Sequence, residues 1–129
     1  MKRHTAGEDY LKTIYILHSE QGYVRSVDVA ARLKVSKPSV CYAVQVLKSS
    51  ELITVDENLF LHLTEKGSEI AERIFARHIF FTNMLLDCGV DPVVAHADAC
   101  RMEHAISQES FAKLERVWND RRMISVSGK

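Results

Sequence analysis

The feature that most constrains the fold is a pair of short predicted helices separated by only two residues. Residues 26–33 have helical spacing of apolar side chains, and residues 34–35 interrupt it. Ser36 can then cap a second helix whose first turn accommodates Pro38. The buried stripe of this second helix is predicted at Val40, Val44 and Leu47. Together these signals predict a helix-turn-helix.

The flanking segments extend this pattern to a winged helix. Thr5 and Glu8 have the spacing of a capping box, so we expect a first helix from Thr5 to Gln21. Residues 52–55 and 59–63 read as two short strands around the turn-forming residues 56–58. A winged helix reads DNA by placing its second helix in the major groove. A three-helix domain with no DNA-binding role would show a similar pattern.

The second half of the sequence is predicted to be entirely helical. A long helix is expected over 64–87, a second helix opens at Asp91 and Pro92, and Ser107 can cap a third. The apolar stripe of these helices is wider than one small domain needs, which favours a symmetric dimer. The predicted fold is therefore mainly α, with an N-terminal winged helix-turn-helix (1–63) followed by an all-helical dimerisation domain (64–129).

The segment "ACRMEHA" (99–105) places a thiol, a carboxylate and an imidazole within five positions. Glu103 and His104 follow Cys100 by three and four residues, so on a helix all three side chains would share one face. This spacing suits a metal site. An ordinary amphipathic helix, with a small buried cysteine and a solvated glutamate, explains it as well.

Composition narrows the class of protein. No apolar run approaches the roughly 18 residues that span a membrane, and the N-terminal residues are polar, so we expect a cytoplasmic protein without a membrane partner. Three widely spaced cysteines favour reduced thiols. Residues 1–50 carry eight Lys and Arg against four Asp and Glu, and the remainder carries nine against thirteen. The basic half could face phosphate and the acidic half could hold cations.

Five segments in order resemble the diphtheria-toxin-repressor family, which includes the manganese-transport regulators. They are "EDYLKTIYIL", "VSKPSVCYAVQVL", "LTEKG", "ARH" and "ACRMEH", spread over roughly residues 7–120. The resemblance implies a homodimeric winged-helix repressor of metal-uptake genes. Such a protein binds palindromic operator DNA when it is loaded with Mn(II) or Fe(II), and it is not an enzyme.

The resemblance also implies a set of metal ligands. The family's principal site corresponds to Asp9, Cys100, Glu103 and His104. Iron-responsive members typically have methionine and cysteine where manganese-responsive members have aspartate and glutamate, so this sequence mixes the two types. Lys12 stands where manganese-responsive members have a second carboxylate, and a charged ammonium cannot be a ligand. One ion per chain is therefore expected.

A second site is implied at His78 and His96. In iron-type members a carboxylate completes it, at the position of Thr82 here, together with groups from a further C-terminal domain, which we do not expect in this protein. Simpler explanations exist for the individual residues. Asp9 would sit in the first turn of a helix, where any carboxylate is favoured. His78 lies on an apolar stripe, where core histidines are common.

The expected DNA-binding residues fall into two groups. Those that face bases in the resembling family correspond to Ser36, Pro38, Ser39 and Tyr42. Those expected to meet phosphates are basic side chains: Arg25, Arg32, Lys34, Lys37 and Lys48. Asp56 and Glu57 make the predicted hairpin tip acidic, so we expect the tip to add little attraction to phosphate.

Two other functions compete with a metal-dependent regulator. A metal-independent winged-helix transcription factor would keep the first half but would not need Asp9, Cys100, Glu103 and His104 to converge. A hydrolase could use Cys100 as its nucleophile with a histidine base. However, Cys100 lies within a predicted helix and no glycine-rich turn accompanies it, so the sequence does not favour an enzyme.

Overall fold

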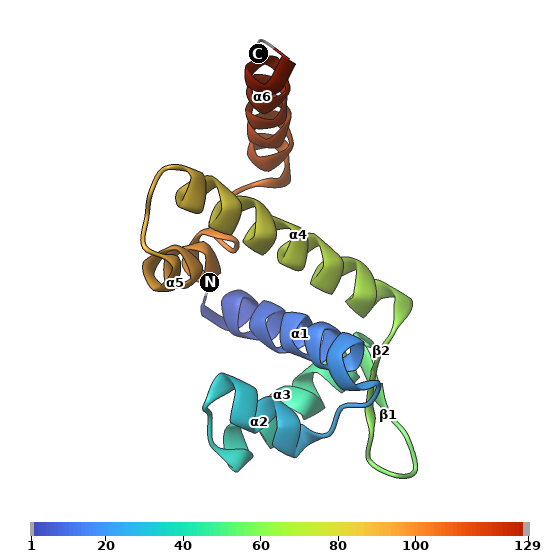
Figure 1. The fold of residues 1–129 in the computed structure, drawn as a ribbon. Helices are drawn as coiled ribbons and strands as arrows, with labels where there is room; N and C mark the ends of the chain where they lie inside the picture. Colours follow the sequence, from blue (N-terminus) through green and yellow to red (C-terminus); the bar gives the residue numbers. More distant parts are fainter. Residues whose placement is uncertain (1, 128–129) are drawn as a thin grey trace. The chain divides into compact units, whose positions relative to one another are not determined.

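The computed structural model of the chain describes the backbone of residues 2–127 and the side chains of residues 7–121. Within this part of the chain there are six α-helices and one two-stranded sheet, labelled in Figure 1. The chain divides into two compact units, Met1–Phe75 and Ala76–Lys129. Helix α4 (Glu65–Asp87) crosses this division, so each unit contains part of it.

The first unit begins with three helices, α1 (Lys2–Gln21), α2 (Ser26–Leu33) and α3 (Lys37–Ser49). After α2, Lys34 adopts a left-handed conformation (φ 56°, ψ 46°), which turns the chain sharply. Ser36 then caps α3, because its Oγ accepts a hydrogen bond from the Ser39 amide at 3.2 Å, with Pro38 in the first turn. The predicted helix-turn-helix is confirmed.

The wing is a short antiparallel hairpin of β1 (Ile53–Val55) and β2 (Leu61–Leu63). Both strands are shorter than the sequence predicted. For β1, the Leu52 amide donates to the Leu47 backbone oxygen of α3 (3.0 Å) and so is not part of the strand pairing. For β2, the reason is the turn, where the Asp56 Oδ1 accepts hydrogen bonds from the Asn58 and Phe60 amides, and Leu59 has a positive φ of 67°. Residues 59–60 therefore belong to the turn.

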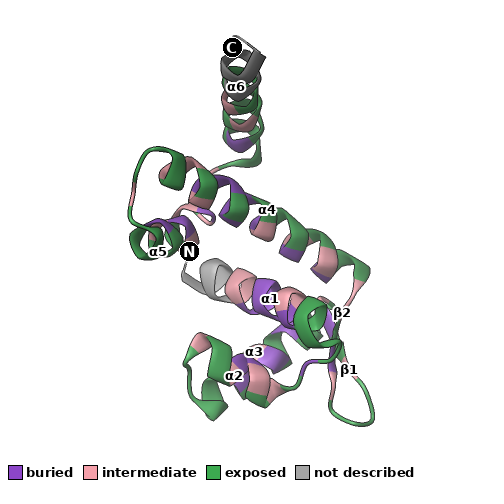
Figure 2. Cartoon of the chain, viewed as in Figure 1, coloured by how far each residue is buried: buried purple, intermediate pink, exposed green. Residues whose placement is uncertain are grey.

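The core of the first unit is formed by apolar side chains from the three helices, the hairpin and the start of α4 (purple in Figure 2). Its buried members include Leu11, Ile14, Val24, Val29, Val40, Val44, Leu47, Ile53, Leu61 and Ala71. The stripe of α3 predicted from the sequence lies in this core. Its burial fixes which face of α3 remains on the surface.

The second unit contains the end of α4 together with α5 (Pro92–Met102) and α6 (Gln108–Ser127). Asp91 caps α5 by accepting hydrogen bonds from the Val93 and Val94 amides, as the sequence predicted. The Oγ of Ser107 likewise accepts from the Ser110 amide at 3.1 Å, before α6. The core of this unit is an aromatic cluster with Ala99, built on Phe80, Phe81 and Phe111.

The predicted start of the first helix is wrong. Helix α1 begins at Lys2, so Thr5 is not at its end, and the Thr5 side chain lies outside the described residues. Asp9 is consequently about two turns inside α1 rather than in its first turn. The favourable interaction of a carboxylate with the helix dipole is confined to the first turn, so it does not explain Asp9.

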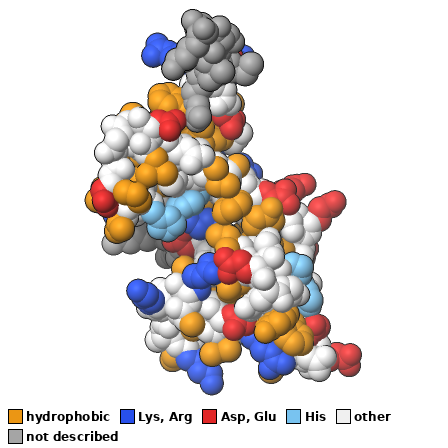
Figure 3. All heavy atoms as spheres, viewed as in Figure 1, with side chains coloured by type: hydrophobic (Ala, Val, Ile, Leu, Met, Phe, Trp, Pro, Cys, Tyr) orange, Lys and Arg blue, Asp and Glu red, His pale blue; other side chains and the backbone are white. Residues whose placement is uncertain are grey.

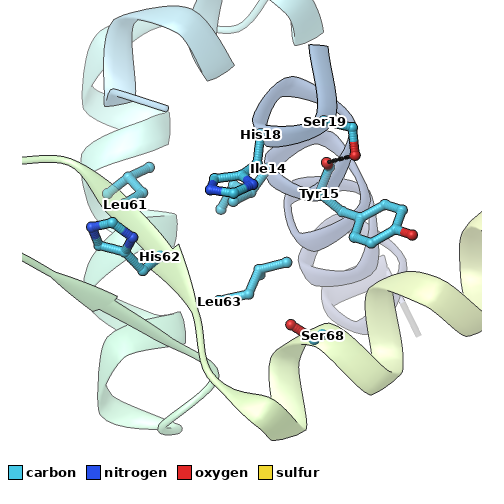
Figure 4. Close-up of a pocket in the computed structure, with 8 residues that line it drawn as sticks. All are labelled: Ile14, Tyr15, His18, Ser19, Leu61, His62, Leu63 and Ser68. Carbon is cyan, nitrogen blue, oxygen red and sulfur yellow. Dashed lines mark hydrogen bonds between the residues drawn. The ribbon is translucent and has the colours of Figure 1, made fainter. Parts of the chain in front are cut away.

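A cavity of about 220 Å³ lies in the first unit between α1, β2 and the start of α4 (Figure 4). His18 and His62 line it together with Ile14, Leu61 and Leu63. Small-molecule sites are typically about 300–1,000 Å³, so this cavity is small for an organic effector. No helix among the described residues has the length and apolar character needed to cross a membrane.

We predict that Gly67→Ala destabilises the chain. A Cβ at Gly67 would lie 2.0 Å from the backbone oxygen of Leu52, so the first turn of α4 would have to move away from the residue that precedes β1. The free energy of unfolding should fall by about 3 kcal/mol, measured by urea denaturation at constant protein concentration.

Gly7→Ala is the matched control. It meets no atom within 4 Å and lies inside α1, so stability should rise by about 0.5–1 kcal/mol. Equal effects of the two substitutions would contradict this packing.

Candidate metal centre and DNA-binding face

The second unit contains a buried carboxylate held between two imidazoles. Glu103 is the C-terminal cap of α5, and its side chain has no exposed surface. His78 of α4 places Nδ1 2.9 Å from Glu103 Oε1, and His104 places Nε2 3.2 Å from Oε2. Both imidazole side chains are nearly buried, at 11% and 4% exposure. Each oxygen of the carboxylate therefore has a ring nitrogen beside it.

This arrangement has the chemistry of a metal-binding group. A buried ionised carboxylate is costly unless it is paired or bound to a cation. At these distances the imidazole N–H groups can donate to the two oxygens. Oxygen and nitrogen donors are also the ligands that divalent first-row metals accept. The residues present in this unit thus fit a divalent cation.

Cys100 lies in a neighbouring group with two histidines. Its Sγ is 3.8 Å from His78 Nδ1 and 3.9 Å from His96 Nε2. His78 Nε2 and His96 Nδ1 are 3.1 Å apart, with the rings edge to face. Pale-blue histidine atoms gather at one place on the surface of this unit in Figure 3. His78 therefore contacts both groups.

Within the second unit, the structure shows contacts among the residues that were predicted to be ligands. Helix α5 ends at Met102, so Glu103 is the cap residue and His104 lies in the following turn. Glu103 and His104 are in contact, whereas Cys100 approaches His78 and His96, the residues expected at the second site. Asp9 lies in α1 and belongs to the first unit.

Arg77 is a residue of this centre that the sequence analysis missed. Its Nη1 donates to the backbone oxygens of Glu103 (3.1 Å) and Ile106 (2.8 Å), and its Nη2 donates to Gln108 Oε1 (3.0 Å). Arg77 belongs to α4, so these hydrogen bonds from its buried guanidinium hold the turn with Glu103 and His104 against that helix. The only signal available was its position before His78 in "ARH", which does not reveal backbone contacts.

Thr82 replaces the carboxylate expected at the second site. Its Oγ1 is buried, with no hydrogen-bond partner among the described residues. A neutral hydroxyl does not supply the negative charge of a carboxylate ligand. Of the three positions expected at the second site, only His78 and His96 therefore carry side chains suited to bind a metal ion.

In the first unit, the predicted base-reading residues lie on the surface of α3. Tyr42 is 73% exposed, and Lys37, Pro38 and Lys48 are also exposed. Ser36 and Ser39 are exposed but engaged, since the Ser36 hydroxyl donates to Ser39 Oγ at 2.9 Å. The N-terminus of α3 therefore presents short side chains, followed by one large aromatic ring.

The structure refines the other expected contacts. The Arg25 guanidinium lies 4.4 Å from the centre of the Phe60 ring, which holds it beside the wing. Arg32 forms an ion pair with Glu20, so it is less available to a phosphate. Ala43 packs against the core, so it is not part of the exposed face of α3. Gln45, one turn after Tyr42 and exposed, is a candidate base contact that the sequence analysis missed.

The acidic wing tip has a structural explanation. The Asp56 carboxylate lies 2.8 Å from His62 Nε2 and accepts from two backbone amides of the turn. The hydrogen bond to His62, and then the one from the Phe60 amide, lower the pKa of Asp56 from its usual value. Asp56 is thus an organiser of the hairpin turn.

Two family models match consecutive parts of the chain. The iron-dependent repressor N-terminal DNA-binding domain matches residues 4–59, and the iron-dependent repressor metal-binding and dimerisation domain matches residues 64–123. Together they cover most of the sequence. Their descriptions agree with the winged helix in the first unit and the histidine-rich centre in the second.

Similar proteins carry names consistent with these models. The HTH-type transcriptional regulator MntR of Shouchella clausii (strain KSM-K16) is 36% identical over 107 residues, which are 83% of this chain and 75% of that protein. The transcriptional regulator MntR of Escherichia coli O6:H1 is 39% identical over 104 residues, covering 81% of this chain and 67% of the relative.

Solved structures show the same fold. The manganese regulator SloR matches 88% of this chain with a TM-score of 0.79 and 27% identity, and T. acidophilum IdeR matches 95% with a TM-score of 0.71 and 27% identity. The chain spans about half the length of these two solved chains, 53% and 54%. The chain therefore belongs to the iron-dependent repressor family of metal-dependent, DNA-binding transcriptional regulators, which are not enzymes.

Proposed function

We propose that this chain is a cytoplasmic repressor of metal-uptake genes, acting as a homodimer on palindromic operator DNA when loaded with Mn(II) or Fe(II). One observation is the main support for this proposal. The same chain combines an exposed recognition helix, α3, with a buried Glu103 carboxylate between two imidazoles. The MntR relatives and the manganese regulator SloR support the choice of metal.

The proposed principal site consists of Asp9, Cys100, Glu103 and His104. The buried contact of Glu103 with His104 supports two of these ligands. The simplest alternative explanation for Asp9, a carboxylate stabilised by the helix dipole, does not apply because Asp9 lies about two turns inside α1. When bound, the ion supplies positive charge that neutralises the carboxylates. One ion per chain is proposed there, and His78 and His96 are proposed to hold a second.

The proposed switch follows from the division of the ligands between the two units. Asp9 belongs to the unit that carries α3, and the other ligands belong to the unit matched by the dimerisation model. An ion bound by both would join a DNA-reading half (1–63) to a sensing half (64–129). Without the ion, the carboxylates of Asp9 and Glu103 would repel each other. Metal would then select one arrangement of the recognition helices.

Dimer formation is supported by apolar side chains that the second unit leaves exposed. They include Ile79, Val93, Val94, Leu114 and Val117. The family model for residues 64–123 describes a dimerisation domain. A metal-independent regulator is not favoured, because the same model describes metal binding. In a symmetric dimer the two α3 helices would meet two halves of a palindrome.

The proposed function predicts metal-dependent and salt-sensitive DNA binding. Affinity for a duplex selected from random DNA should be strong with Mn(II) or Fe(II) and weak in chelator. It should also fall linearly on a logarithmic scale with salt, because Arg25, Lys34, Lys37 and Lys48 would displace counterions. Fluorescence anisotropy titrations measure both effects.

Lys37→Ala should reduce the slope of the logarithm of affinity against the logarithm of salt concentration by about 1, because one phosphate would no longer be neutralised. Equal affinity in chelator and in saturating metal would refute the proposal.

A second prediction concerns base reading by Tyr42. Tyr42→Ala should lower affinity for the selected duplex by roughly tenfold or more, which corresponds to about 1–3 kcal/mol per base contact, with little effect on random DNA. The fold should be unaffected, since the ring is 73% exposed. Tyr42→Phe is the control, because it separates a hydroxyl hydrogen bond from packing of the ring. An equal loss of affinity on both DNAs would make Tyr42 a phosphate-binding residue.

A further inference from the structure

A groove on the first unit combines an apolar floor with two cationic side chains. It is lined by residues from the first half of α1, the end of α3 and the start of α4, and its volume is about 480 Å³. Small-molecule sites typically have volumes of roughly 300–1,000 Å³. All the lining residues precede Ala76, so the groove belongs to the first unit alone.

The floor of the groove is apolar and is fixed by the backbone. Leu11 and Leu47 are buried there, and Val46 is 44% exposed. Leu52 also lines the groove. Its amide donates to the Leu47 backbone oxygen and its own backbone oxygen accepts from the Thr64 amide, both at 3.0 Å. The end of α3 is thereby tied to the start of α4, so the apolar surface is formed before a ligand binds, which lowers the cost of binding.

Lys66 and Arg73 place positive charge beside this floor. With Ile70, they recur on α4 at a spacing of four and three residues, so the three side chains share one face of the helix. Both cationic side chains are exposed, and neither forms a hydrogen bond or an ion pair within residues 7–121. Glu8 is the one carboxylate among the described lining residues, and it already has an interaction partner. The groove therefore offers unpaired positive charge to an anion.

We propose that this groove binds a small monocarboxylate with an apolar body, such as a medium-chain fatty acid. The apolar body covers the floor, and the carboxylate accepts charge-assisted hydrogen bonds from Arg73 and Lys66. A DNA backbone would use the two cations but would leave the apolar floor uncovered, so the lining favours an organic anion. The end of α3 forms one wall, so the ligand would bind to the recognition helix itself, independently of the metal centre.

Methyl NMR of the reduced, metal-free full chain tests this proposal without DNA. Octanoate is titrated below its micelle-forming concentration. The methyl signals of Val46 and Ile70 report on the groove, and those of Val93 and Val117 report on exposed apolar side chains of the second unit. We expect saturable shifts at Val46 and Ile70. The neutral 1-octanol has the same chain length and should bind about tenfold more weakly, because the hydrogen bonds to a charged group are lost.

Three variants locate the binding groups. Arg73→Gln should weaken octanoate binding about tenfold and leave octanol binding nearly unchanged. Val46→Asp places a carboxylate on the floor and should abolish octanoate binding. Both positions are exposed, so both variants should fold normally, and circular dichroism checks this. Arg116→Gln is the matched control, because it removes an exposed arginine of α6 in the second unit and should leave octanoate affinity unchanged.

Three results would overturn the proposal. Equal affinities for octanoate and octanol would show that the two cations contribute nothing. Unchanged octanoate affinity in Arg73→Gln would place the carboxylate elsewhere. Absence of shifts at Val46 and Ile70, including shifts confined to Val93 and Val117, would show that the groove is not the site. The measurement contains neither metal nor operator DNA, so the proposed function is judged separately.

Discussion

The buried carboxylate of Glu103 is the constraint around which the second unit is organised. A fully buried carboxyl group needs partners on both oxygens, and His78 and His104 provide them at 2.9 and 3.2 Å. The backbone must hold these partners in place, and Arg77 does so through hydrogen bonds to the carbonyl groups of Glu103 and Ile106. Carboxylate and imidazole groups from the end of α5, the turn after it and α4 are thereby held in contact.

The starts of helices α3, α5 and α6 were predictable from the sequence, because capping residues next to each start determine them. The caps at Ser36, Asp91 and Ser107 are each read from a few adjacent residues, and all three are present. The start of α1 was misjudged because a capping-box spacing also occurs inside helices. Arg77 could not have been identified, because its partners lie 26 to 31 residues away and are mostly backbone groups.

The candidate site was predictable only in part. The spacing of Cys100, Glu103 and His104 indicated a shared face, but α5 ends at Met102 and places His104 in a turn. Local spacing cannot reveal that His78, from another helix, lies between the thiol and the carboxylate. The central proposal is that a bound ion would join the two units, with Asp9 as its ligand from the first unit.

The most direct test is the ratio of operator affinity in saturating Mn(II) to affinity in chelator, for wild type, Asp9→Ala and Glu8→Ala. Glu8 is the matched control, since it is the neighbouring carboxylate of α1 and is also half-buried. Asp9→Ala should bring the ratio close to one while the remaining ligands still bind metal, because the coupling between the units is lost. Glu8→Ala should keep the wild-type ratio. A wild-type ratio in Asp9→Ala would contradict the proposed role of the ion.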